Sequence, residues 1–390
     1  MNNHSERSHA ILSPSSAKMW LNCPPSARLA EELGSKDSAY AEEGTFAHGM
    51  AEYALNQFRD GKYDIMDELP IAEGAESNKY FSPEMVRYVS EYVDFVISEH
   101  YEMQKTGSYA GMLLEAKVDI SKYAPECFGS VDVQLISDTE IHIIDLKYGA
   151  GVKVYAKENP QMMLYALGCY ESLTPEAQKK IRTVKMTIGQ CRLAHYDSTE
   201  MPINDLLGWG KNEVTERAKT AFAGKGELKC GDWCKFCPAK ATCRKQYENV
   251  VSDFESHKDP KLMTDAEITD MIGKIDDYKS WLESLNRYVY DEALAGKKWE
   301  GYKLIEGMTS RKFTDTKAVE NELYSLMYKP EEILKPSELK SLTELEKLIG
   351  KRKFADTLGG FITSSVGLPK LVPESAKGKE FSALSDFDIE

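Results

Sequence analysis

The chain has 390 residues, with 63 acidic and 49 basic side chains and a formal net charge of −14. This acidity argues against a broad non-specific grip on DNA, which needs local neutralisation of phosphates. It has no apolar run long enough to span a bilayer, and its polar start lacks the apolar stretch of a signal peptide. We therefore expect no membrane association and a cytoplasmic, reducing location, since its eight cysteines include a metal-like pattern.

Hydrophobic periodicity predicts alternating helices and strands over the first two thirds of the chain. The order favours an α/β (α+β) fold in which a mixed central sheet is flanked by helices. The expected elements are helices at about 41–59 and 83–104, strands at about 111–120, 128–137 and 140–147, a helix at about 158–173, a strand at about 181–191 and a helix at about 203–223.

The carboxy-terminal region differs in pattern from the rest. Thr264 and Glu267 have capping-box spacing at the start of a long helix with heptad-like apolar residues. We predict a mainly helical accessory domain over 262–362. From 373 to 390 the chain is rich in small and charged residues, which predicts a disordered acidic tail.

The run from Ile143 to Gly149 carries the first candidate site residues. Asp145 and Lys147 leave the same face of the expected strand, because side chains alternate along a strand. Gln161 and Tyr165 are four residues apart in the following helix, and this spacing places both on one helical face. A carboxylate beside a lysine forms a pair that can hold a metal ion and take part in chemistry next to that ion.

Two further motifs lie upstream. In 128–135 the apolar residues Val131, Val133 and Leu135 are expected on one core face, so Asp132 points to the other. Gly44-Thr45-Phe46-Ala47-His48 opens a helical stretch and offers a histidine. Glu115, in the preceding strand, is a weaker candidate for a supporting acid.

Taken in order, G-T-x-x-H, G-x-x-D, D-x-K and Q-x-x-x-Y resemble the core of the RecB-like branch of the PD-(D/E)XK nucleases. The resemblance covers about residues 10–250 and implies a restriction-endonuclease-like fold for that domain. It also implies that His48, Asp132 and Asp145 are metal ligands. The residues that it assigns to catalysis are Asp132, Asp145, Lys147, Gln161 and Tyr165.

The expected ligands predict the metal. Carboxylates of Asp132 and Asp145 suit Mg²⁺ or Mn²⁺, and the nitrogen of His48 suits Mn²⁺ better. The ion would polarise the scissile phosphate, and Lys147 would stabilise the developing negative charge. By resemblance, Gln161 and Tyr165 position the lysine and the substrate backbone.

A second motif is made of cysteines. One cysteine, Cys23, precedes the nuclease-like segment, and Cys234-x₂-Cys237-x₅-Cys243 follows it. This split pattern resembles the iron–sulfur staple of the AddB nuclease domain and of CRISPR-associated RecB-like nucleases. It implies a structural [4Fe–4S] cluster. Structural Zn²⁺ is the alternative, because tetrahedral thiolate sites suit both.

Cys230 leaves two other interpretations open. With Cys234, Cys237 and Cys243 it offers a local four-cysteine zinc site, which would leave Cys23 free. Cys230-x₃-Cys234-x₂-Cys237 also spells the radical-SAM motif. Radical-SAM enzymes carry that motif near the start of a barrel, whereas here it follows the core, so this function is the less favoured one.

The resemblance implies a Mg²⁺- or Mn²⁺-dependent deoxyribonuclease, most simply an exonuclease or end-processing enzyme that hydrolyses phosphodiester bonds. The arrangement is also similar to RecB-like proteins of bacteriophages and prophages, which implies DNA and phage recombination or replication proteins as partners. The alternative is a non-catalytic nucleic-acid-binding module on a nuclease fold. His48, Asp132, Asp145 and Lys147 together favour the enzyme, because a binding module has little need for all four.

Overall fold

The computed structural model describes residues 10–34, 39–65, 67–105, 109–255 and 263–300. The chain divides into two compact units, residues 1–291 and residues 292–390. The strands and nearly all described helices belong to the first unit. The predicted tail at 373–390, and the part of the predicted helical domain beyond residue 300, lie outside the described residues.

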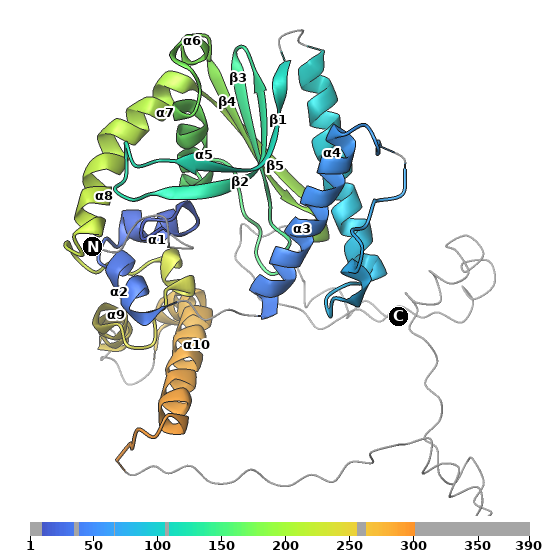
Figure 1. The fold of residues 1–390 in the computed structure, drawn as a ribbon. Coiled ribbons are helices and arrows are strands. Elements are labelled where there is room, and N and C mark those ends of the chain that lie inside the picture. Colours follow the sequence, from blue (N-terminus) through green and yellow to red (C-terminus); the bar gives the residue numbers. More distant parts are fainter. Residues whose placement is uncertain (1–9, 35–38, 66, 106–108, 256–262, 301–390) are drawn as a thin grey trace, which may run out of the picture. The chain divides into compact units, whose positions relative to one another are not determined.

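A five-stranded mixed sheet forms the centre of the first unit (Figure 1), with its strands in chain order. The third and fourth strands pair in parallel, and the other neighbouring strands pair antiparallel. The strands are β1 (Tyr109–Asp119), β2 (Phe128–Ser137), β3 (Glu140–Leu146), β4 (Thr183–Gln190) and β5 (His195–Pro202). The parallel step requires a crossover, which contains α5 (Pro160–Glu171) and the short α6 (Pro175–Gln178).

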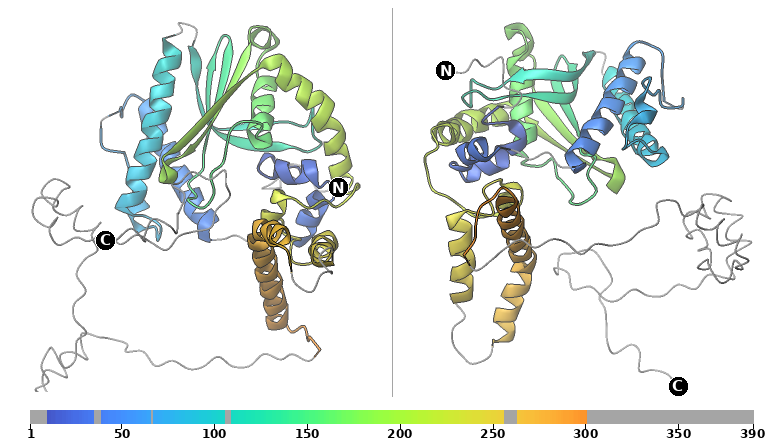
Figure 2. Two further views of the ribbon diagram at one scale, coloured as in Figure 1. Left: turned by 180° about the vertical axis from the view of Figure 1, so that it is seen from behind. Right: turned by 60° about the horizontal axis from the view of Figure 1, so that its bottom comes forward.

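Helices cover both faces of the sheet, and each face has its own apolar core (Figures 1 and 2). One face packs against α5 and against four shorter helices. These are α1 (Ala17–Asn22), α2 (Ser26–Leu33), α7 (Ile203–Trp209) and α8 (Thr215–Phe222). The other face packs against two long helices, α3 (Ala39–Arg59) and α4 (Pro83–Gln104). The sheet is therefore buried between two helical layers.

Burial on both faces explains the composition of β3. Ile141 and Ile143 belong to the core beside α5, whereas Ile144 and Leu146 belong to the core beside α3 and α4. A central strand with two covered faces needs an almost continuous apolar run. Asp145, which is 3% exposed, and His142, which is 1% exposed, are the two buried polar residues of this strand.

The predicted face of β2 is wrong in one detail. Val131, Val133 and Leu135 are all buried, but Val131 lies in the core beside α5 and the other two lie in the core beside α3 and α4. Glu115 of β1 has a positive φ of 44°, and the β1–β2 ladder has no Cα pair between Glu115 and Asp132, although the register is the same on both sides of this gap. Simple alternation fails across such a local distortion.

The structure confirms the predicted fold class: an α+β arrangement with a mixed sheet flanked by helices, followed by a helical segment. Several elements differ from the prediction. It has no counterpart for β5 or for the helices Ser26–Leu33, Pro175–Gln178 and Arg244–Glu255. The helix expected at 203–223 consists of α7, a π-helical turn at Gly210–Val214 and α8. A Cβ at Gly210 would come within 2.9 Å of Tyr123 and Leu167, so close packing requires glycine at this turn.

Two helices follow the core, α9 (Arg244–Glu255) and α10 (Asp265–Leu294). The predicted capping box is present at the start of α10: Thr264 N donates to Glu267 Oε2 over 2.6 Å, and Glu267 N donates to Thr264 Oγ1 over 3.3 Å. Tyr278 and Trp281 of α10 pack with Val250 of α9. Among the described helices, none combines the length and the apolar character needed to cross a bilayer.

Candidate active site and cysteine cluster

Three metal-binding side chains converge from three different elements. His48 extends from α3, Glu115 from β1 and Asp132 from β2, and one donor atom of each lies within 4.8 Å of the others. His48 Nδ1 is 3.4 Å from Asp132 Oδ2. The sequence analysis assigned His48 and Asp132 to the metal and gave Glu115 only a supporting part. The structure places a carboxylate oxygen of Glu115 within 4.8 Å of the donor atoms of both.

The backbone explains how Glu115 reaches this position. Its φ of 44° is left-handed, which is rare for a residue other than glycine and costs roughly 1–3 kcal/mol. Such an irregularity in a strand re-aims a side chain. Ser130 Oγ then donates to Glu115 Oε2 over 2.9 Å and holds the carboxylate. No feature of the sequence signals a positive φ at a glutamate, so sequence reasoning underrated this residue.

Asp132 is fixed by the neighbouring strand. Its Oδ2 accepts a 2.7 Å hydrogen bond from the backbone N–H of Leu146, at the end of β3. This bond joins β2 to the point where β3 delivers Asp145 and Lys147. One carboxylate thus connects the group around His48 with the acid–lysine pair.

The predicted acid–lysine pair is present. Lys147 Nζ lies 2.8 Å from Asp145 Oδ2, and the two side chains are 31% and 4% exposed. Gln161, from α5, donates through Nε2 to Asp145 Oδ1 over 3.3 Å and lies 3.5 Å from the hydroxyl of Tyr165. The structure therefore brings Asp145, Lys147, Gln161 and Tyr165 together as the sequence motifs predicted.

Mutual electrostatics shift the pKa values of this group. Burial raises the pKa of Asp145, although the ammonium of Lys147 opposes the rise. Burial acts against the charged form of Lys147, but the carboxylate of Asp145 outweighs it and raises the pKa of Lys147. Lys147 is therefore cationic at neutral pH. Burial, and then the charge of Asp132, raise the pKa of Glu115.

The same balance applies to the histidine. Burial opposes protonation of His48, but the hydrogen bond and the charge of Asp132 outweigh it and raise its pKa. Crowded carboxylates raise one another's proton affinity unless a cation neutralises them. The site thus has an excess of negative charge that suits a bound cation.

The donor chemistry fits a divalent ion. Glu115 and Asp132 supply carboxylate oxygens and His48 supplies a nitrogen, a set that suits Mn²⁺ and also Mg²⁺. Oδ2 of Asp145 is buried, and the ammonium of Lys147 lies 2.8 Å from it. The metal-binding donors that the structure groups together are therefore those of His48, Glu115 and Asp132.

Tyr165 depends on a glycine in the neighbouring strand. A Cβ on Gly129 would lie 2.8 Å from Cε1 of Tyr165 and 3.3 Å from Cγ of Pro14. The glycine of the G-x-x-D motif therefore makes room for the tyrosine ring. Burial, and then the charge of Asp145, raise the pKa of Tyr165, so its hydroxyl stays protonated as a hydrogen-bond donor.

Tyr92 is a neighbour that the sequence analysis did not identify. It comes from α4 and is 1% exposed, and its hydroxyl has no hydrogen-bond partner among the described residues. Burial raises its pKa, and the charges of Asp132 and Asp145 add to the rise. In the sequence, a tyrosine on the apolar face of a helix is indistinguishable from a core residue.

The four cysteines of the predicted staple line one cavity, although Cys23 is far from the others in sequence. The backbone N–H of Lys229 donates to Cys23 Sγ over 3.5 Å, and Cys234 Sγ donates to the carbonyl of Lys229 over 3.8 Å. Burial raises the pKa of Cys237 to about 11, and the charges of the other three thiols contribute to the rise. The chain ends of the core therefore meet at this cavity.

Cys230 lies beside the set. Burial raises its pKa to about 12, with contributions from Cys234 and Cys243, but it does not line the cavity. Among the described residues, no three thiols come within 4.8 Å of one another, in contrast to the group around His48. A single tetrahedral zinc with bonds of about 2.3 Å would draw its sulfurs to within about 3.8 Å.

Lys240 connects this cavity with α10. It is 7% exposed, and burial lowers its pKa. Its Nζ donates to Ser280 Oγ over 2.6 Å. The segment between Cys237 and Cys243 is thus tied to the long helix by a buried cation.

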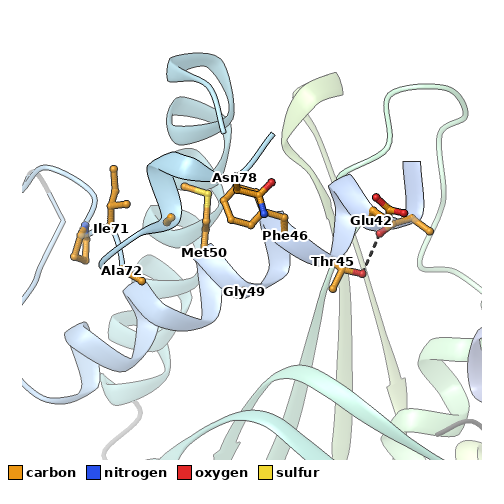
Figure 3. A pocket seen from close by; sticks show the side chains of 11 residues that line it. Glu42, Thr45, Phe46, Gly49, Met50, Ile71, Ala72 and Asn78 are labelled. Carbon is orange, nitrogen blue, oxygen red and sulfur yellow. Dashed lines mark hydrogen bonds between the residues drawn. The ribbon is translucent and has the colours of Figure 1, made fainter. Parts of the chain in front are cut away.

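A larger cavity, of about 540 Å³, lies beside α3. Figure 3 shows Phe46 and Met50 projecting from α3 on the side of the segment that carries Asn78. Its lining is mainly apolar and contains none of the metal-binding side chains described above. The residues that line it are Ala41, Glu42, Thr45, Phe46, Gly49, Met50, Pro70, Ile71, Ala72, Ala75 and Asn78. The chemistry therefore places the candidate active site at the sheet and not in the larger cavity.

Comparison with known proteins gives a family for the chain. Among solved structures, it is similar to one titled "Crystal structure of SSO0001", at 10% identity and a TM-score of 0.24, over 57% of this chain and 95% of that one. This likeness carries no argument about function. The family model described as "Protein of unknown function (DUF2800)" matches residues 9–379, so the chain belongs to the DUF2800 family.

Proposed function

We propose that this protein is a divalent-metal-dependent DNA nuclease of the RecB-like PD-(D/E)XK type. The observation that carries the proposal is the junction of two groups: the donors of His48, Glu115 and Asp132, and the pair of Asp145 with Lys147. Asp132 connects them through its hydrogen bond to the end of β3. A buried acid and a cationic lysine beside a metal-binding group suit phosphodiester hydrolysis.

Different residues of the chain have different roles in the proposed reaction. A bound Mg²⁺ or Mn²⁺ supplies Lewis acidity and a water of lowered pKa. Asp145 holds Lys147 in place. The ammonium of Lys147 donates hydrogen bonds to the phosphate oxygens, on which negative charge develops. Gln161 keeps Asp145 in position through its 3.3 Å hydrogen bond, and Tyr165 adds a neutral hydroxyl donor toward the substrate backbone.

We further propose that Cys23, Cys234, Cys237 and Cys243 hold a structural [4Fe–4S] cluster. Support comes from the shared cavity and from the N–H···S bond of Lys229 to Cys23, since such bonds are typical of cluster thiolates.

The proposed substrate is DNA, and the proposed reaction is cleavage at DNA ends. The motif order's similarity to RecB-like phage proteins supports partners in phage recombination or replication and a place in the host cytoplasm. The competing function is nucleic-acid binding without catalysis.

Incubation of the purified full chain with end-labelled single- and double-stranded DNA tests the proposal. We expect cleavage with Mn²⁺ or Mg²⁺ and none with EDTA. Lys147→Ala, purified in the same way, controls for a contaminating nuclease. Binding of Mn²⁺ and DNA without cleavage would replace the enzyme with the binding module.

A further inference from the structure

The loop between β3 and α5, residues 147–159, starts and ends at the candidate active site. Lys147 at its start pairs with Asp145, and Gln161 just beyond its end donates to the same Asp145. A ligand bound along this loop therefore lies next to the acid–lysine pair. The inference below rests on the proposed function and names the form of its substrate.

Side chains of β4 and β5 hold the loop in one conformation. Buried Gln190 accepts from Val154 N over 2.7 Å and donates to the carbonyl of Val152 over 2.9 Å. Asp197 Oδ2 accepts from Ala156 N over 2.7 Å. These bonds fix the backbone, so the residues between them project outward from a rigid support.

The outward side of this loop has an unusual composition for so acidic a chain. Tyr155 is 57% exposed, and its ring meets His195 edge-on at 5.2 Å between centroids. Lys153 and Lys157 flank it and are exposed. Neither ammonium has an ion-pair partner in the described part of the chain, unlike Lys180, which pairs with Asp138. The loop thus offers two exposed lysines around one exposed aromatic ring.

We propose that residues 149–158 bind a single strand of nucleic acid beside the active site. Tyr155 stacks on an unpaired base, and Lys153 and Lys157 contact phosphates on either side of it. Stacking platforms between basic residues are how proteins hold single strands without reading sequence. A duplex keeps its bases stacked on one another, so it cannot offer a base to Tyr155 in the same way.

Equilibrium binding in EDTA tests this inference apart from cleavage. Fluorescence anisotropy measures the affinity of the full chain for a labelled single strand and for the matching duplex. We expect Tyr155→Ala to weaken single-strand binding by about tenfold or more and Tyr155→Phe to retain it. Tyr290→Ala, at a tyrosine on α10 that is 56% exposed, is the matched control.

The salt dependence of DNA binding tests the role of Lys153 and Lys157 separately. Replacing both Lys153 and Lys157 with alanine should lower the slope of log affinity against log salt by about 0.7 per lost phosphate contact. Lys211→Ala, at an exposed lysine of the π-helical turn, should leave the slope unchanged.

The results separate the two ideas. Unchanged single-strand affinity in Tyr155→Ala and in the double lysine variant would overturn the loop inference, even in a protein that cleaves DNA. Loop-dependent single-strand binding by a protein that never cleaves with Mn²⁺ would support the loop inference and contradict the nuclease.

Discussion

Lys147 is the residue whose role the nuclease proposal specifies most sharply. Lys147→Ala removes a charge that acts mainly on the transition state. We expect the variant to fold, to bind Mn²⁺ and DNA, and to cleave about a hundredfold more slowly or worse, on the scale of losing one preorganised electrostatic donor. Calorimetry with Mn²⁺ and a single-turnover cleavage assay measure the two effects.

Lys185→Ala is the matched control for that variant. Lys185 also pairs with a carboxylate, Glu99, over 2.6 Å, and it is not one of the candidate site residues. Because both side chains of this pair are only 22% exposed, Lys185→Ala should lower the stability of the fold, but cleavage by the folded variant should be normal. Equal cleavage rates for Lys147→Ala and Lys185→Ala would contradict the role proposed for Lys147.

Asp145 is expected to behave differently from the lysine. Asp145→Ala removes the counter-charge of Lys147 and the acceptor of Gln161, and it takes a carboxylate from the cation-binding region. We expect it to lose cleavage and to weaken Mn²⁺ binding as well. Full Mn²⁺ affinity in this variant would restrict the metal ligands to His48, Glu115 and Asp132.

Gly129 offers a test that concerns packing alone. In Gly129→Ala the added Cβ would be 2.8 Å from the ring of Tyr165, so the ring must move. Such overpacking typically costs about 1–3 kcal/mol, which urea unfolding would show as a lower midpoint. Gly49→Ala on α3, with nothing within 4 Å of its Cβ, should be neutral or stabilising by up to about 1 kcal/mol.

The site could be predicted from sequence only in part. The common face of Asp145 and Lys147 follows from the period of a strand. His48 and Asp132 were assigned to the site by the resemblance of their motifs to the RecB-like branch, not by spacing. The presence of Glu115 and Tyr92 at the site could not be predicted from spacing. The first depends on a positive φ and the second on how α4 packs over the sheet, and neither leaves a local signal.

At the scale of elements, the long helices and four of the five strands could be predicted from apolar patterns. β5 could not, because this strand pairs with β4 alone and its sequence, His195 to Pro202, is mostly polar and half exposed. Its position comes from pairing with β4 after a turn in which Ala194 has a φ of 46°. Strands at a sheet edge need little apolar surface, so their periodicity is weak.

A buried polar network joins β3, β4 and α4. His142 of β3 is 1% exposed and forms a 2.8 Å hydrogen bond with Thr187 of β4. Its Nδ1 lies 3.5 Å from Glu99 of α4. Burial, and then the charge of Lys185, hold the pKa of His142 well below its usual range.

This lowered pKa predicts acid sensitivity of the fold. Below about pH 6.5 the unfolded chain protonates His142 while the folded chain does not, so unfolding takes up a proton. The free energy of unfolding should therefore fall with decreasing pH, by up to about 1.4 kcal/mol per pH unit from this group. In His142→Gln that contribution should be lost, as urea unfolding at pH 7 and pH 5.5 would measure.

His195→Gln, at a half-buried histidine of β5, serves as the comparison. The difference in stability between pH 7 and pH 5.5 should shrink more in His142→Gln than in this control. The same pH dependence in both variants would mean that His142 is not the group that titrates.

At the scale of the whole molecule, the cysteine cavity joins parts of the chain that are distant in sequence. Cys23 follows α1, and Lys229, whose N–H donates to its sulfur, is 206 positions later. Lys240 extends the connection to α10 through Ser280. A metal cluster here would fasten both ends of the sheet domain and the middle of the long helix.

We expect anaerobically purified protein to be brown and to contain about four irons per chain. Cys23→Ala and Cys237→Ala should each lose the iron, because each removes a thiolate, whereas Cys127→Ala, in the apolar core, should keep it. Since the cluster would hold α1 against the segment before α9, iron-free variants should be cut faster by protease near residues 228–243. Iron content by mass spectrometry and limited proteolysis measure both effects. Stoichiometric zinc would contradict the iron–sulfur assignment, and unchanged metal in Cys23→Ala would transfer the site to Cys230, Cys234, Cys237 and Cys243.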